Sequence, residues 1–236
     1  LWSRNVSRKN LVNYVKSKNK KLFEQMLSGF HVFIKENTPE NVDLEEVFSR
    51  VNMLMPEHLL QLIDVVYIGH FKIFDDRNIN ATQINGALYI SNDQDSNADM
   101  IDDIVHEIAH SAEQKYRYLI YDDDSIKNEY FGKLKKLKNY LAFEGYDIRN
   151  VNFFNEKYNQ EFDDFLHKEI GYDNLRPLIR DLFLDPYSCT SMREYFSSCF
   201  EKFVLTGNHD LLKNLCPYVY KKIYLLFNYN MEDDEL

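Results

Sequence analysis

The chain has 236 residues, a formal net charge of −10 and a pI near 5.2. This size fits one domain, or one domain with a helical annex. The acidic balance makes nucleic acid and anionic membranes poor partners for the surface as a whole. With 44% hydrophobic residues, seven Gly and five Pro, the composition disfavours a turn-rich β protein or a disordered chain. The elements expected along the chain predict an α+β, mostly helical fold.

The cysteine content bears on the compartment. The three residues Cys189, Cys199 and Cys216 are too few and too odd in number for a disulfide framework, so we expect reduced thiols. No apolar run reaches membrane-spanning length, and no signal-peptide hydrophobic region is visible. Because the chain begins at Leu1, we expect a fragment or a processed product. Its compartment stays unknown, either a reducing one or that of a secreted or delivered effector without disulfides.

The N-terminal region, residues 1–60, is expected to be a helical cover. Residues 8–35 have the spacing of a basic amphipathic helix or helix pair, a second helix is expected over 43–53, and a short one opens at Pro56. This region carries no catalytic pattern, so we interpret it as a surface that could dock a protein partner. The remaining residues, 61–236, would form the functional domain.

Two strands are expected before the centre of the chain. Residues 65–74 are β-branched and aromatic, residues 75–83 form a polar loop, and residues 86–91 form a second short strand. His70 falls in the first strand, where we expect a structural or surface histidine and not a metal ligand.

The next segment predicts an amphipathic helix from about residue 97 to about residue 118. Ser96 and Asp99 offer a start that resembles a capping box. The apolar stripe that would bury against a core consists of Ile101, Ile104, Val105, Ile108 and Ala112.

A second face of this helix carries the HExxH pattern of zinc peptidases, from His106 to His110. Histidines four residues apart lie on one helical face, so His106 and His110 can share one metal ion while Glu107 points at the cavity beside it. The alternative is a helix with two surface histidines and no metal, because so short a pattern also arises by chance. Its placement in an amphipathic helix favours a zinc site.

The rest of the chain is expected to be helical, with an inserted helical segment over about 120–180. The expected helices cover residues 126–141, 155–170, 174–184, 191–204 and 210–227, the last of them bent near Pro217.

A catalytic zinc with two histidines needs a third protein ligand, for which Glu194 is the best candidate. It begins a helix whose apolar face is formed by Tyr195, Phe196, Cys199, Phe200 and Phe203. Glu201 shares the face of Glu194 and is the second choice. Glu194 could instead serve a capping box with Ser191, and both roles can coexist.

These motifs together resemble a known family. The His106–His110 motif, followed by Tyr187 and then by Glu194-Tyr195-Phe196-Ser197, is similar to the anthrax lethal factor-type metallopeptidase domain, a group that includes the clostridial Pro-Pro endopeptidases. The resemblance covers about residues 60–210. It implies a zincin-like fold, a toxin-like effector, and a tyrosine seven positions before the glutamate ligand. Tyr187 would then donate a hydrogen bond to the oxyanion.

The resemblance also implies that the substrate lies extended along an edge strand before the metal helix, for which residues 86–91 are the candidate. Two features depart from the family. Ser198 stands where a second acidic residue usually follows, and the 84-residue interval from His110 to Glu194 is long. Glu129 and Glu144 therefore remain outside candidates for the third ligand.

The expected function is that of a zinc-dependent endopeptidase. Zn²⁺ on His106, His110 and Glu194 would activate a water, and Glu107 would act as the general base. The alternative is a catalytically inactive peptidase-like domain that acts as a binding or structural subunit. An aminopeptidase ranks below both, because no motif for gripping a free amino terminus is recognisable. The partner is expected to be a protein or peptide substrate, without nucleic acid or membrane.

Overall fold

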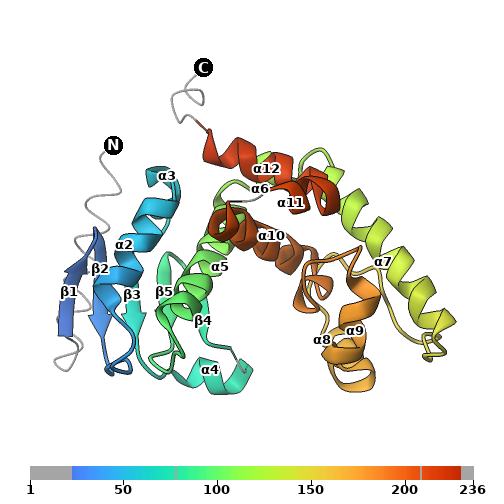
Figure 1. Cartoon of the computed structure of the whole chain (residues 1–236), viewed down its shortest axis with the longest axis horizontal. Coiled ribbons are helices and arrows are strands. Elements are labelled where there is room, and N and C mark those ends of the chain that lie inside the picture. Colours follow the sequence, from blue (N-terminus) through green and yellow to red (C-terminus); the bar gives the residue numbers. More distant parts are fainter. Residues whose placement is uncertain (1–22, 78, 208, 230–236) are drawn as a thin grey trace. The chain divides into compact units, whose positions relative to one another are not determined.

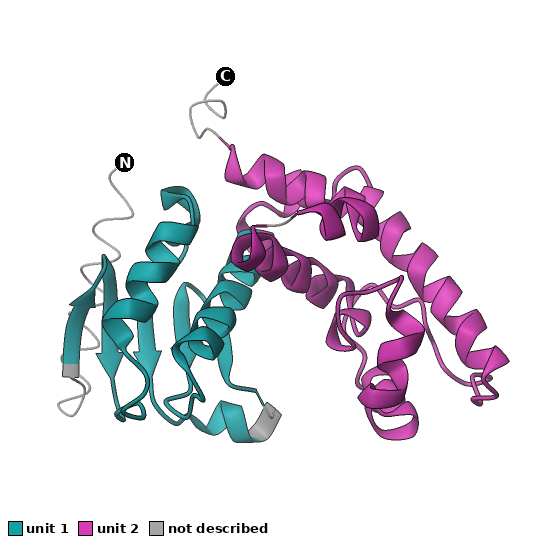
Figure 2. Ribbon diagram, viewed as in Figure 1, with its two compact units in different colours: residues 1–112 teal, residues 113–236 magenta. Residues whose placement is uncertain are grey.

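The computed structural model describes residues 23–77, 79–207 and 209–229. The chain forms two compact units, residues 1–112 and 113–236, coloured separately in Figure 2. The sequence placed a boundary after residue 60, whereas the division falls after Ala112, three residues before helix α5 ends.

Unit 1 contains a five-stranded mixed sheet in the order β1-β2-β3-β5-β4 (Figure 1). The strands are β1 (Phe23–Leu27), β2 (Phe30–Ile34), β3 (Val65–Ile68), β4 (Ala81–Ile84) and β5 (Ala87–Ile90). The three central strands β2, β3 and β5 run parallel, while β1 and β4 pair antiparallel at the two edges.

Both antiparallel pairs are hairpins closed by two-residue turns. Ser28 and Gly29 join β1 to β2, with φ of 46° and 93°, and Asn85 and Gly86 join β4 to β5, with φ of 52° and 83°. Positive φ at both turn positions is typical of a type I′ turn, which matches the twist of the paired strands and favours Asn-Gly.

Two helices lie on one face of the sheet in Figure 1, α2 (Leu44–Leu54) and α5 (Asn97–Lys115). Their N-terminal ends lie side by side, because Asn97 Nδ2 donates to Glu46 at 2.8 Å and Asn97 Oδ1 accepts from the Asp43 N–H at 2.8 Å. The short helices α3 (Glu57–Leu60) and α4 (Lys72–Arg77) flank β3 in the sequence.

The sheet presents apolar side chains on both faces. The fully buried residues include Val32, Val66, Ile68, Leu88 and Ile90. On the opposite face the rings of Phe33, Tyr67 and Tyr89 stack across β2, β3 and β5, with centroids 5.6 and 5.1 Å apart. Cross-strand aromatic pairs of this kind stabilise a sheet in a defined register.

The prediction of a helix over residues 8–35 is wrong for residues 23–34, which form the β1–β2 hairpin, and its first part lies outside the described residues. The 1–60 region is therefore not a purely helical cover. Helix α2 and the helix after Pro56 are confirmed. The residues from Phe23 to Ile34 satisfy a helical spacing as well as a strand spacing, and the turn at Ser28-Gly29 decides between them.

The strand predictions need three corrections. β3 ends at Ile68, and α4 occupies part of the expected strand and loop. β4 lies in what was expected to be a polar loop. The segment 86–91 contains β5, as expected, but β5 pairs with β3 on one side and with β4 on the other. It is therefore an interior strand, and β4 is the edge.

All regular secondary structure in the described residues of unit 2 is helical, and residues 144–159 form a long connection without a helix. Its elements are α6 (Arg117–Tyr121), α7 (Ser125–Phe143), α8 (Gln160–Asp164), a π-helix η1 (Phe165–Ile170), α9 (Tyr172–Ile179), a 3₁₀ turn η2 (Tyr187–Cys189), α10 (Met192–Thr206), α11 (Asp210–Leu215) and α12 (Pro217–Phe227). The expected helices correspond to these elements with three differences. The segment 155–170 starts later, at Gln160, the segment 174–184 ends earlier, at Ile179, and the last helix is divided at Pro217.

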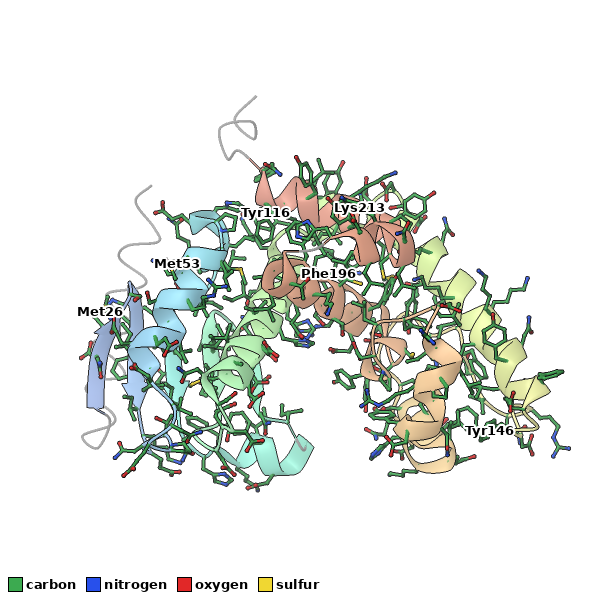
Figure 3. The ribbon with its side chains drawn as sticks, viewed as in Figure 1. Met26, Met53, Tyr116, Tyr146, Phe196 and Lys213 are labelled. Atoms are coloured by element: carbon green, nitrogen blue, oxygen red, sulfur yellow. The ribbon has the colours of Figure 1, made fainter. Side chains whose placement is uncertain are left out.

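Helix α10 is the most buried element of unit 2, because every residue from Glu194 to Phe200 is buried. Tyr195 packs against Tyr130 of α7 and against Phe183, both at centroid distances of 5.6 Å. On the same helix Phe196 (labelled in Figure 3) packs against Phe200. Aromatic side chains therefore make up much of the core around α10.

A buried lysine also contributes to this core. Lys133 Nζ donates to the carbonyl oxygens of Leu182 at 2.6 Å and of Leu215 at 2.5 Å, and it lies 5.0 Å from the Tyr195 ring centroid. Hydrogen bonds and a cation–π contact compensate for the loss of hydration of the charge. No described helix is both long and apolar enough to cross a membrane.

The two hairpin turns offer a matched stability test. Gly29→Ala introduces strain only, because φ is 93° and nothing lies within 4 Å of the added Cβ. Gly86→Ala adds a clash, because its Cβ would lie 2.5 Å from Asp64 Oδ2. We expect Gly29→Ala to cost about 1–2 kcal/mol in unfolding free energy and Gly86→Ala to cost more. Urea denaturation measures both unfolding free energies. Equal losses would show that the Asp64 side chain moves aside without cost and that the clash is not destabilising.

Candidate metal centre

Helix α5 positions the two histidines. Ser96 Oγ accepts from the Asp99 N–H at 3.2 Å and donates to the Asp99 carboxylate at 2.9 Å, so the expected cap is present. Ile104, Val105, Ile108 and Ala112 are fully buried, as the stripe predicted, whereas Ile101 is only half-buried and Met100 takes its place in the core. This burial sets the rotation of the helix, and thereby the face that carries His106 and His110.

The rings of His106 and His110 are neighbours on that face. Their centroids lie 4.8 Å apart and their planes are perpendicular, at 90°. His110 is 6% exposed and Glu107 is 8% exposed. Ser111 Oγ donates to the Glu107 carbonyl at 3.1 Å, inside the helix. The two imidazoles are therefore held by a rigid and largely buried helical turn.

Helix α10 positions Glu194 in its first turn. The Glu194 N–H donates to Ser191 Oγ at 3.1 Å, which is the cap the sequence suggested as an alternative role. Ser197 Oγ lies 3.3 Å from Glu194 Oε2, and Glu194 is 9% exposed. The cap is compatible with a ligand role, because it uses the backbone N–H of Glu194 and not its carboxylate.

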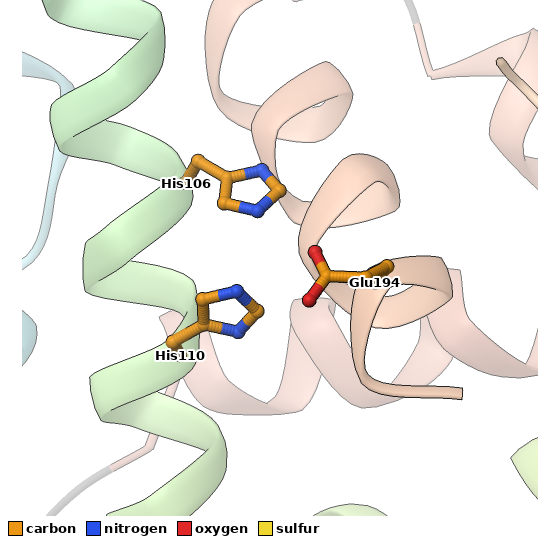
Figure 4. A group of neighbouring side chains, drawn as sticks. All are labelled: His106, His110 and Glu194. Carbon is orange, nitrogen blue, oxygen red and sulfur yellow. The ribbon is translucent and has the colours of Figure 1, made fainter. Parts of the chain in front are cut away.

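His106, His110 and Glu194 form the group that could hold a metal ion among the described residues (Figure 4). Each offers one ligand atom, and these atoms lie within 4.8 Å of one another. Two imidazole nitrogens and one carboxylate oxygen are donors that first-row divalent cations accept in proteins. The donor set therefore fits a metal ion.

Among the described residues, the other candidate ligands are not part of this group. Glu129 accepts from Tyr195 Oη at 2.8 Å and from the Tyr218 N–H at 3.2 Å. Glu144 follows the end of α7 and is exposed. Glu201, the second choice for the third ligand, also lies outside the group. His70 is exposed and pairs with Asp75 at 2.9 Å, which agrees with the surface role expected for it.

Tyr187 stands on the turn η2 and is 39% exposed. Burial raises the pKa of its phenol, and the carboxylates of Glu194 and Asp163 raise it further. The phenol thus keeps its proton at neutral pH and can donate a hydrogen bond. Its surroundings include Tyr158 and Tyr172, whose hydroxyl groups donate to Asp163 at 2.7 and 3.3 Å.

Sequence reasoning missed two supporting groups. Ser197 follows Glu194 by three residues, a spacing that places its hydroxyl beside the carboxylate, so this signal was readable. Arg193 pairs with Glu113 in the last turn of α5, with 3.4 Å between Nε and Oε2, and Glu113 also accepts from Tyr121 Oη at 2.8 Å. No pattern in the sequence indicates that Glu113 and Arg193 pair, because the two residues are far apart along the chain.

Comparisons with protein-family models, with curated proteins and with solved structures find no match for this chain.

The assignment of the third ligand can be tested by metal binding alone. Glu194→Ala removes one of three donors, so we expect it to weaken zinc affinity by roughly two orders of magnitude or more. Glu201→Ala, seven residues along the same helix, is the matched control and should bind zinc like the parent. Competition titration with a chromophoric chelator measures both affinities. Loss of affinity in the control instead would assign the ligand to Glu201.

Proposed function

We propose that this chain is a zinc-dependent endopeptidase with a zincin-like arrangement of its metal helix and sheet. The observation that carries the proposal is the group of His106, His110 and Glu194, with Glu107 directly following the first ligand. Three protein donors leave a coordination position for water or substrate, which distinguishes a catalytic site from a closed structural one.

The chemistry divides between the ion and the side chains. Zinc, when bound, supplies the Lewis acidity that makes a water acidic near neutral pH and polarises a carbonyl. Glu107 accepts the proton of the attacking water and delivers it to the leaving amine. Its position directly after His106 on α5 is the basis for assigning it this role.

Tyr187 is the proposed donor to the oxygen that becomes negatively charged when water adds to the carbonyl. Its phenol is protonated at neutral pH, and its turn precedes the helix of Glu194 by only a few residues. A donor aimed at developing charge lowers the barrier without strengthening substrate binding.

The substrate is proposed to lie extended along β4. Ser91 N–H donates to Asn80 O at 2.7 Å, which continues the β4–β5 ladder beyond Ala81↔Ile90. In an antiparallel ladder the hydrogen-bonded pairs alternate, so the N–H and C=O groups of Ala81 and Gln83 face away from β5. Such an edge pairs with an extended peptide through its main chain. This replaces the expected role of residues 86–91, whose strand is interior.

Hydrolysis should depend on zinc and on Glu107. Chelation should abolish cleavage of a peptide library, and added zinc should restore it. Glu107→Gln keeps the shape of the side chain but cannot take up a proton, so turnover should fall by at least about two orders of magnitude while zinc stays bound. Mass spectrometry of the library measures turnover. Zinc binding by a parent protein that cleaves no peptide would favour the inactive binding domain.

Tyr187→Phe separates the oxyanion donor from a merely structural aromatic. The variant should retain zinc and keep KM within a few-fold. It should lose about 3 kcal/mol of transition-state stabilisation, roughly a hundredfold in kcat. Steady-state kinetics on the best library peptide measures the change. An unchanged kcat would remove Tyr187 from the mechanism and leave the rest of the proposal standing.

A further inference from the structure

The last turn of α5 is bound inside unit 2. Glu113 lies in this turn, and the division between the units falls directly before it, so Glu113 belongs to unit 2 together with α10. Its side chain is 12% exposed, and its Oε2 lies 3.4 Å from Arg193 Nε. Its Oε1 accepts a hydrogen bond from the Tyr121 hydroxyl at 2.8 Å. Each oxygen of this carboxylate therefore has a partner from another helix of unit 2.

The two partners of Glu113 lead to α10 on both sides of Glu194 in the sequence. Arg193 directly precedes Glu194. The Tyr121 ring packs against Phe196, two residues after Glu194, with ring centroids 6.3 Å apart. Burial raises the pKa of the Tyr121 phenol, and the Glu113 carboxylate raises it further, so the hydroxyl keeps its proton and can donate. Glu113 is thus connected to the first turns of α10 by two routes.

Glu113 also has a fixed relation to His110. Residues three apart lie on one face of a helix, about one turn from each other. The helix α5 runs without interruption through His106, His110 and Glu113. A contact that holds Glu113 beside Arg193 therefore restricts where the preceding turn, with His110, can face Glu194.

We infer that Glu113 is a positioning residue of the candidate metal centre, which sets the distance between His110 and Glu194 through its ion pair with Arg193. This inference rests on the proposed function. The ion pair is half-exposed on its Arg193 side, and such pairs contribute little to folding stability. Groups that orient metal ligands without touching the ion nevertheless change metal affinity by about tenfold or more.

The direction of the change in zinc affinity separates positioning from simple charge effects. Arg193→Met keeps the apolar part of the side chain and removes its charge. Loss of a positive charge next to Glu194 would by electrostatics alone strengthen zinc binding. Loss of positioning should instead weaken it, by about tenfold. Competition titration with a chromophoric chelator measures the affinity, and zinc binding as tight as in the parent, or tighter, would overturn the inference.

A double-mutant cycle tests whether Glu113 and Arg193 act as a pair. Glu113→Gln retains an acceptor for the Tyr121 hydroxyl but loses the charge, and it should also weaken zinc affinity by about tenfold. The double variant should lie within about twofold of either single variant, because no pair remains to be broken. Losses that multiply in the double variant would overturn the inference, since the two residues would then act separately.

Asp123→Asn is the matched control. The ion pair of Asp123 with Lys222 also lies in unit 2, and its side chains are 55% and 13% exposed, close to the 52% and 12% of Arg193 and Glu113. Neither residue belongs to α5 or α10. The control should bind zinc like the parent. An equal loss of affinity in the control would overturn the inference, because loss of any ion pair in unit 2 would then be sufficient.

Urea denaturation of the zinc-free proteins separates positioning from a merely structural role. If Glu113→Gln lowers the unfolding midpoint and leaves the zinc affinity of the folded protein unchanged, the pair is structural only and the inference fails. These measurements use zinc without substrate, so they decide the inference even when the parent cleaves no peptide, a result that would refute the proposed function alone. A parent protein that binds no zinc would refute both.

Discussion

The burial of the Glu194 carboxylate is the constraint on which the candidate site depends. An ionised carboxylate that leaves water costs several kcal/mol unless polar partners replace the lost hydration. Glu194 is 9% exposed on the most buried helix of unit 2, and it has Ser197 Oγ at 3.3 Å. Its place in the first turn of α10 adds the favourable end of the helix dipole. A cation shared with the two imidazoles of the group would add a favourable charge beside this carboxylate.

Helix α10 serves the core and the site with different faces. Tyr195, Phe196 and Phe200 pack in the aromatic core, while Ser191, Glu194 and Ser197 make polar contacts. In the family that the sequence resembles, an acidic residue usually follows the glutamate ligand by four positions, and Ser198 stands there in this chain. Tyr187 lies on the turn η2, shortly before the α10 N-cap Ser191, so the candidate ligand and the proposed oxyanion donor belong to one continuous segment.

Much of the candidate site could be predicted from the sequence, because the patterns that indicate it lie within single helices. Histidines at i and i+4 with a buried stripe on another face predict which side chains of α5 lie together. The Ser191 cap and the aromatic spacing after Glu194 locate the start of α10 in the same way. Most helices were likewise predicted, since their periodicity extends over several turns. The third ligand lies 84 residues after His110. The sequence limited the candidates to a few glutamates, but residue spacing alone could not identify which of them is the ligand.

The tertiary structure decided the features that depend on pairing between distant segments. Residues 23–34 fit a helical spacing but pair into a hairpin, and β2 then joins β3 in parallel. β5 became interior because the Asn85-Gly86 turn folds β4 back against it, which moved the free edge to residues 81–84. Glu113 and the distant Arg193 form their ion pair only in the folded chain. The sequence by itself determined the face of α5, the cap of α10 and the ligand types. Strand order and carboxylate partners came from long-range contacts, whose energies no local window of residues contains.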